Sequence, residues 1–371
     1  MRAHARSFVT AVRSTVTVTA VAMTVALGLG LTGCASGAAT AEKETQSTAV
    51  TLVVHDSFGD AKAFSKAASA ATGYDVKVIT AGDGGELTNK LVLTKGAPIA
   101  DAFFGVDNSF ASRLIEHGVV EPYQPAQLPD RARELGAELS PEGAADGPLP
   151  MVPVDLGATC MNIDTGWFTE HGVAPPKSYR DLADPRYKDL TVLIDPTTSS
   201  TGAAFLIGTV SAFGEDGFAD YWRSLVKNGV RIEPGWSEAY NGQFTRGGGD
   251  GKYPIVLSYS TSPAWTLSDD GSATTTAALL DTCTSQIEYA GVLAGAANMK
   301  GAKAVVDYLL SREFQDTIAD TMYMYPVDPE AALPADWKRF AALPSAPHDL
   351  TPAQIGQGRE RWLKTWSDAV E

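Results

Sequence analysis

The sequence is poor in the residues that hydrolases and metalloproteins use. It has no G-x-S-x-G segment, which would place a nucleophilic serine on a sharp turn. The glycine cluster at 247–253 lacks the Ser or Thr of a phosphate-binding loop, so it is expected to be a turn. After residue 33 the histidines are scattered without the spacing of metal ligands, at His55, His117, His171 and His348. No catalytic residue, metal site or cofactor is therefore expected.

Positive charge is also scarce, with 29 Lys and Arg against 44 Asp and Glu and a net charge of −15. This deficit argues against nucleic acid as a partner, because binding to phosphates depends on Lys and Arg. An acidic surface raises the local concentration of cationic ligands, so the net charge is weak evidence for a cationic ligand.

The N-terminus has the pattern of an export signal. Residues 1–33 contain three arginines, no acidic residue and an apolar run over 16–31 that ends in Leu-Thr-Gly-Cys. The alternative, a membrane-spanning helix, needs about 20 apolar residues, and this run is shorter and interrupted by glycines. The pattern predicts a lipoprotein signal peptide at 1–33, lipidation of Cys34 and a flexible tether at 34–48. Removal of the signal changes the net charge from −15 to −18.

Cysteine is rare, and only Cys160 and Cys283 remain once Cys34 is assigned to the lipid. Two thiols in an oxidising compartment most simply form one disulfide. The alternative is a pair of buried free thiols.

The remaining chain, about 320 residues, is longer than one hydrophobic core usually serves, so two lobes are expected. Strand-like and helical runs alternate, which predicts an α/β fold with parallel strands. The strand-like runs 149–164 and 285–295 are expected to cross between the lobes as a two-strand hinge. Lobe 1 is expected at 49–157 plus about 284–324, and lobe 2 at 158–283 plus about 325–371.

Several helices are predicted from capping residues and apolar spacing. Asn108 is expected to cap a helix at 109–118, Ser178 a short helix, and residues 300–320 are expected to form one helix. The last helix, 351–371, carries an apolar stripe that is most simply a core face: Ile355, Trp362, Leu363, Trp366 and Val370.

Three polar loops each follow a predicted strand and precede a predicted helix, at 55–58, 81–86 and 195–204. In α/β proteins such loops lie at the carboxyl edge of the sheet, where ligands bind. The third loop places the hydroxyls of residues 198–201 at a helix N-terminus, which favours an anion. Ordinary helix capping explains one or two of those hydroxyls. If these groups face the cleft, a phosphate ester should bind there.

Aromatic residues are concentrated in two loops without hydrophobic periodicity, "GWSEAY" at 235–240 and "LSYSTSPAW" at 257–265. Each of these rings could simply pack at the end of a strand. Together they favour a site that stacks on a flat ligand.

Taken in order, the chain resembles the thiamine-binding proteins of bacterial thiamine ABC importers. The motifs that carry the resemblance run from about residue 50 to the C-terminus: "DSF" at 56–58, "DG" at 83–84 with "LTNKL" at 87–91, "GVDNS" at 105–109, "MVPVDLG" at 151–157, "DPTTSSTG" at 195–202, the two aromatic loops, "YMYPV" at 323–327 and "TPAQ" at 351–354. The resemblance implies a type II periplasmic-binding fold, whose two lobes close on a ligand without chemistry.

The resemblance also implies the ligand contacts. These are Asp83, Gly84, Ser199, Ser200, Gly202, Trp236, Tyr259, Trp265, Tyr323 and His55. Three of these positions depart from the family pattern. His55 stands where relatives have Tyr, Trp265 where they have Tyr, and Tyr323 where they have Trp.

The expected function is capture of thiamine, or its phosphate esters, by a monomer outside the cytoplasm, anchored to the membrane by its lipid only. The partner is an ABC permease driven by a cytoplasmic ATPase. Alternatives are a ferric-ion or polyamine binder of the same fold and an exported enzyme, which turnover of thiamine or its esters would reveal.

Overall fold

The computed structural model describes residues 47–140 and 147–371. The expected signal peptide, Cys34 and nearly all of the expected tether lie outside these ranges. No helix within the described ranges has both the length and the apolar character needed to cross a membrane.

The described strands form one mixed sheet in the order β2-β1-β3-β10-β5-β8-β6-β7. β1 pairs in parallel with β2 and β3, and β6 pairs in parallel with β7 and β8. β10 is antiparallel to β3 and β5, and β5 is antiparallel to β8. The bounds are β1 (Ala49–Val54), β2 (Asp75–Thr80), β3 (Ala102–Asp107), β4 (Val120–Glu121), β5 (Val152–Asp164), β6 (Thr191–Ile194), β7 (Arg231–Glu233), β8 (Ile255–Tyr259), β9 (Thr276–Ala278), β10 (Thr284–Leu293) and β11 (Tyr325–Pro326).

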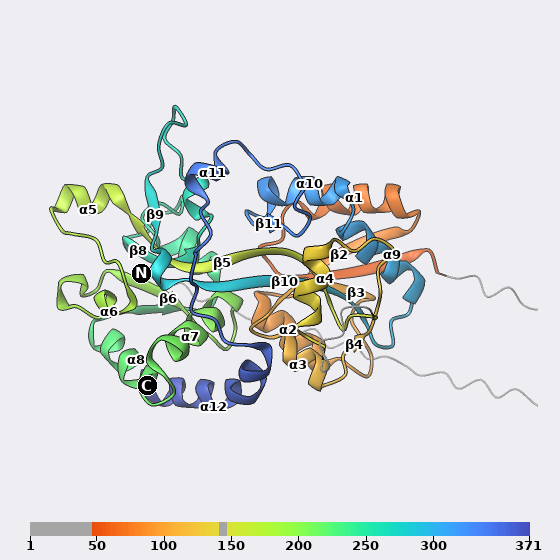
Figure 1. Cartoon of the computed structure of the whole chain (residues 1–371), viewed down its shortest axis with the longest axis horizontal. Coiled ribbons are helices and arrows are strands. Elements are labelled where there is room, and N and C mark those ends of the chain that lie inside the picture. The colour runs from red at the N-terminus through yellow and green to blue at the C-terminus, as the bar shows by residue number, and fades with distance from the viewer. Residues whose placement is uncertain (1–46, 141–146) are drawn as a thin grey trace, which may run out of the picture. The chain divides into compact units, whose positions relative to one another are not determined.

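β5 and β10 connect the two parallel parts of the sheet. Figure 1 shows them running side by side through the middle of this domain, with β1–β3 toward one end and β6–β8 toward the other. One edge of β10 pairs with β3, and residues 159–163 of β5 pair with β8. The chain therefore crosses between the two parts by two strands, as the sequence predicts.

Helices cover the sheet at both ends. Their bounds are α1 (Ala61–Thr72), α2 (Gly84–Leu93), α3 (Ala111–Glu116), α4 (Asp130–Ala137), α5 (Thr165–His171), α6 (Tyr179–Leu182), α7 (Ser200–Phe213), α8 (Phe218–Lys227), α9 (Met299–Leu309), α10 (Arg312–Thr321), α11 (Trp337–Phe340) and α12 (Pro352–Val370). The Ser178 cap of α6 is confirmed: its hydroxyl accepts the N–H of Asp181, whose carboxylate accepts the N–H of Ser178.

The prediction of a single helix over 300–320 is wrong. The segment forms α9 and α10, with a break at Leu310 and Ser311. Ser311 has extended backbone angles, and its hydroxyl accepts the N–H of Phe314, so it starts a new helix. The apolar spacing continues across the break, which is why periodicity alone did not reveal it.

The predicted cap at Asn108 is also wrong. α3 begins at Ala111 without a side-chain cap. The Asn108 amide bonds to β10 instead: its Oδ1 accepts the N–H of Ile287 at 2.9 Å, and its Nδ2 donates to the carbonyl of Ser285 at 3.1 Å. Asn108 therefore ties the end of β3 to a hinge strand.

Separate hydrophobic cores occupy the two ends of the sheet. One packs α7, α8 and α12 against β6 and β8. The other end has two clusters, with α1, α9 and α10 on one side of β1 and β3 and with α2 and α3 on the other. The apolar stripe of α12 joins the first core, because Ile355, Trp362 and Trp366 are buried there and Trp366 meets Trp222 edge-to-face at 5.8 Å. The expected core face of this helix is confirmed.

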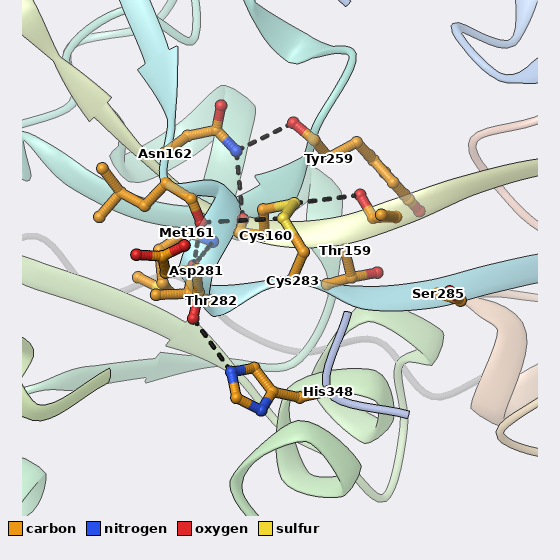
Figure 2. Close-up of a disulfide and its surroundings, with 12 residues drawn as sticks. Thr159, Cys160, Met161, Asn162, Tyr259, Asp281, Thr282, Cys283, Ser285 and His348 are labelled. Carbon is orange, nitrogen blue, oxygen red and sulfur yellow. Dashed lines mark hydrogen bonds between the residues drawn. A yellow bond between two sulfur atoms is a disulfide. The ribbon is translucent and has the colours of Figure 1, made fainter. Parts of the chain in front are cut away.

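A disulfide joins Cys160 of β5 to Cys283, which directly precedes β10. Figure 2 shows it between the two hinge strands, with Thr159 and Tyr259 nearby. Both cysteines are fully buried, and Thr159 pairs with Thr284 in the ladder next to them. The bond therefore fastens β5 to β10 beside the core formed by α7, α8 and α12, which contains the neighbouring residue Met161.

Candidate ligand-binding site

The two aromatic loops lie around a cavity of about 350 Å³, a volume that suits a small molecule. Its walls come from the loop after β1, the segment after β7, the end of β8, β10 and the segment between α10 and β11. Its aromatic lining consists of Trp236, Tyr240, Tyr259, Trp265 and Tyr323, and its polar lining includes His55, Ser57, Asn241, Ser262, Glu288 and Asp320.

Trp236 forms a fixed flat wall of this cavity. Its indole stacks on Tyr240 with ring centroids 4.9 Å apart and planes 11° from parallel. The indole N–H donates to the Ser258 hydroxyl at 2.9 Å, which prevents the ring from rotating. Tyr259 lies at the edge of the same wall, 6.2 Å from Trp236. A ring held in this way can stack on a flat ligand at little conformational cost.

Trp265 and Tyr323 form a second aromatic pair, edge-to-face at 4.5 Å. Trp265 is 59 % exposed, which is unusual for so large an apolar ring. Tyr323 has a φ of 56°, a left-handed conformation that costs a bulky residue about 1–3 kcal/mol and is concentrated at functional sites. Both features are explained if these rings serve a ligand rather than the core.

His55 also reaches the cavity, and its Nε2 lies 3.6 Å from Oε1 of Glu288. Burial lowers the pKa of the imidazole, but the negative charges of Glu288, Asp83 and Asp56 outweigh that effect and raise it above 6.5. The positive form of His55 is thus favoured by its surroundings.

Asp83 does not line this cavity. It caps α2, and its carboxylate accepts backbone N–H groups from Gly84, Ser200 and Trp236, the latter two at 3.0 and 3.1 Å. Burial raises its pKa, and these hydrogen bonds partly offset the shift. Asp83 therefore connects α2, next to one core, to α7 and the Trp236 loop, next to the other.

The hydroxyl-rich loop before α7 does not line the cavity either. Ser199 is the N-cap residue without a capping bond, and its hydroxyl pairs with Thr201 at 2.9 Å. The Thr198 hydroxyl donates to the carbonyl of Pro234. A Cβ at Gly202 would lie 2.5 Å from the Asp195 carbonyl, so this glycine permits a close backbone approach.

Gly84 allows α2 and α7 to meet. A Cβ at Gly84 would collide with the hydroxyl of Ser200, which is buried without a hydrogen-bond partner. Of the ten contacts that the resemblance implies, the structure thus places five on the cavity: His55, Trp236, Tyr259, Trp265 and Tyr323. Asp83, Gly84 and Ser200 meet at the junction of α2 and α7. Ser199 and Gly202 lie at the start of α7, against Thr201 and the Asp195 carbonyl.

Sequence reasoning did not single out Tyr240 or Glu288. Tyr240 ends the "GWSEAY" loop, but only the structure shows that it stacks on Trp236. Glu288 is an acidic residue in the otherwise apolar run 287–293, and a charge in a strand that must be buried is itself a signal of function.

Removing the carboxyl group of Asp107 should reduce the pH dependence of stability. Burial, followed by the charge of Glu288, raises its pKa from 3.8 to about 8. Between these values the folded protein keeps a proton that the unfolded chain releases. This contribution to stability is complete below pH 3.8 and is lost as the pH rises through about 8. The unfolding free energy should fall by up to about 1.4 kcal/mol per pH unit in this window.

Urea unfolding of the wild type and Asp107→Asn at pH 5, 6, 7 and 8 measures this slope. The slope should be smaller in the variant. Equal slopes would show that Asp107 is ionised in the folded protein.

Residues 97–345 match the family described as bacterial extracellular solute-binding protein. This chain belongs to that family. A solute-binding protein needs a cavity between two lobes rather than a reactive centre, which agrees with a site built from aromatic rings.

Individual proteins resemble this solute-binding protein in sequence, in fold or in both. It is 28 % identical over 334 residues to the thiamine-binding periplasmic protein of Escherichia coli, covering 86 % of this chain and 93 % of that one. A solved periplasmic thiamin binding protein superposes with a TM-score of 0.74 at 26 % identity, over 87 % of this chain and 96 % of the other. Iron-bound HitA from Pseudomonas aeruginosa shares the fold, with a TM-score of 0.64 at 20 % identity over 86 % and 99 % of the two chains. The two-lobed type II periplasmic-binding fold expected from the sequence is confirmed.

Proposed function

We propose that this solute-binding protein captures thiamine outside the cytoplasm and delivers it to an ABC permease driven by a cytoplasmic ATPase. The observation that carries the proposal is the aromatic lining of the cavity, with the immobilised Trp236–Tyr240 stack on one side and the Trp265–Tyr323 pair beside it. The names of the E. coli relative and of the superposed structure support the same ligand.

The chemistry of thiamine fits such a lining. Its aminopyrimidine is flat and can stack on an indole, while its thiazolium is a cation attracted to the faces of Trp and Tyr. A cation over an aromatic ring contributes about 0.5–2 kcal/mol when water is excluded. We assign the ligand contacts to Trp236, Tyr240, Tyr259, Trp265 and Tyr323, with His55 at the polar end of the cavity.

Free thiamine is proposed to bind better than its phosphate esters. The N-terminus of α7 was the expected phosphate site, but the N–H of Ser200 already donates to the Asp83 carboxylate at 3.0 Å. A phosphate there would have to displace that carboxylate or lie beside a like charge.

Ferric iron and polyamines are the competing ligands. Tyr323 and Tyr325 were the nearest match to an iron-binding tyrosine pair, but the Tyr325 hydroxyl donates to the carbonyl of Ala341 and does not line the cavity. Within the described residues no cluster of His, Cys, Asp and Glu is arranged to hold a metal ion. A polyamine would need several carboxylates, whereas Glu288 is the one buried carboxylate on the cavity and Asp320 is exposed.

Attachment to the outer face of the membrane through a lipid on Cys34 is part of the proposal, as is action as a monomer. The lipid attachment rests on the sequence pattern at 31–34. Action as a monomer rests on the cavity, whose lining comes from one chain.

A ligand panel tests the function. Trp236 and Trp265 line the cavity, so a bound pyrimidine should quench intrinsic tryptophan fluorescence. Thiamine should quench in a saturable way at micromolar concentration, thiamine monophosphate should need more ligand, and spermidine and ferric citrate should leave the signal unchanged. Saturable quenching by spermidine or ferric citrate, but not by thiamine, would reject the proposal.

A further inference from the structure

Three carboxyl groups stand in one row across the hinge strands. Glu288 of β10 lies opposite Asp107 of β3 on one side and opposite Asp155 of β5 on the other. Residues directly opposite in an antiparallel pair point to the same face, so the three side chains are neighbours. Asp107 and Asp155 are fully buried, and Glu288 is 5 % exposed. Like charges so placed repel each other, so the row cannot be fully ionised.

Within this row, the two aspartates favour their protonated forms. Neither carboxyl oxygen of Asp155 has a hydrogen-bond donor, which suits a protonated group that donates to Glu288. Burial, then the charge of Glu288, raises the pKa of Asp155 well above its usual value and that of Asp107 to about 8. Both shifts favour the protonated form of the aspartate at neutral pH.

Glu288 is also the one member of the row that lines the cavity. A buried carboxylate is costly without a cation beside it. In the described part of the chain its ion-pair partner is His55, whose Nε2 is 3.6 Å away, and no Lys or Arg is paired with it. His55 is an ion-pair partner only while its imidazole is protonated. Burial lowers the pKa of the imidazole, and the negative charges of Glu288, Asp83 and Asp56 raise it. Glu288 thus lines the cavity with an imidazole, and with no permanently positive side chain, beside it.

We propose that Glu288 is a specificity-determining residue, the counter-charge for the cationic ring of the ligand at the polar end of the aromatic cavity. This inference rests on the proposed function and adds to it a residue that selects for charge. The aromatic rings recognise the flat shape of the ligand, whereas Glu288 distinguishes a cation from a neutral ring of the same shape. The protonated carboxyl group of Asp155 positions Glu288 by donating a hydrogen bond to it while keeping its proton, so the pair presents a single negative charge, which matches a monocation.

The experiment compares two ligands with two variants of the mature chain. The ligands are thiamine and a neutral isostere in which carbon replaces the quaternary ring nitrogen. The variants are Glu288→Gln, which keeps the shape and can still bond to Asp155, and Glu238→Gln. Glu238 is an exposed residue of the "GWSEAY" loop that does not line the cavity, so its change controls for loss of one negative charge nearby. Calorimetry at pH 7.5 measures each affinity.

The wild type should bind thiamine about tenfold or more tightly than the isostere, and Glu288→Gln should remove most of that preference by weakening thiamine alone. Glu238→Gln should keep the wild-type preference within about twofold. Equal weakening of both ligands by Glu288→Gln would show a structural role, and an unchanged preference would show that Glu288 does not face the cation. Either result overturns the inference. Failure of the wild type to bind either ligand would instead refute the proposed function.

Discussion

Replacing Trp236 by alanine is expected to weaken thiamine binding by at least about tenfold, which corresponds to about 1.4 kcal/mol. The substitution removes the flat wall on which the pyrimidine is proposed to stack and leaves Tyr240 without its stacking partner. It also removes the indole N–H that fixes the ring to Ser258. Because the ring is held before any ligand arrives, its loss should appear mainly as faster dissociation. Stopped-flow fluorescence and calorimetry measure the two quantities.

Two variants separate stacking from general damage. Trp236→Phe keeps an aromatic face and should recover part of the affinity. Trp167→Ala removes an indole that stacks on His171 in α5, away from the cavity, so it should lower stability without changing the dissociation constant. If Trp236→Ala binds thiamine as tightly as the wild type, the Trp236–Tyr240 stack is only part of the fold.

Reduction of the disulfide between Cys160 and Cys283 is expected to lower the unfolding free energy by about 2–5 kcal/mol. The bond closes a loop with a sequence separation of 123 residues, so its loss greatly enlarges the unfolded ensemble. It also removes the covalent link between β5 and β10. Urea unfolding with and without reductant measures the difference.

The matched control is the double variant Cys160→Ala and Cys283→Ala, whose stability should not respond to reductant. Thiol counting on the denatured, unreduced chain from residue 47 onward should find no free thiol. Two reactive thiols in that assay would contradict the pairing and leave the ligand assignment untouched.

The sequence predicted the features that depend on local patterns. Apolar runs bounded by turn residues predicted the hinge strands β5 and β10, and the two cysteines left after Cys34 predicted the one disulfide, which the structure places beside these strands. The aromatic loops at 235–240 and 257–265 were singled out because rings without apolar periodicity are unlike a core face, and the structure places them around one cavity.

The features that the sequence did not predict depend on contacts between distant segments. Asp83 bonds to Ser200 and Trp236, which are 117 and 153 residues away, so its carboxylate meets α7 instead of the cavity. The hydroxyls at 198–201 suggested an anion site, but the Thr198 hydroxyl donates to the carbonyl of Pro234, which is 36 residues away, and the Ser199 hydroxyl pairs with Thr201. The register that places Glu288 between Asp107 and Asp155 is a property of the assembled sheet.

The most direct test of the thiamine assignment is a calorimetric titration of the mature chain with free thiamine at pH 7.5. We expect one binding site per chain and a dissociation constant below about 1 μM, which corresponds to more than about 8 kcal/mol of binding free energy. It would be contradicted if thiamine at millimolar concentration produced no binding heat and did not raise the unfolding temperature.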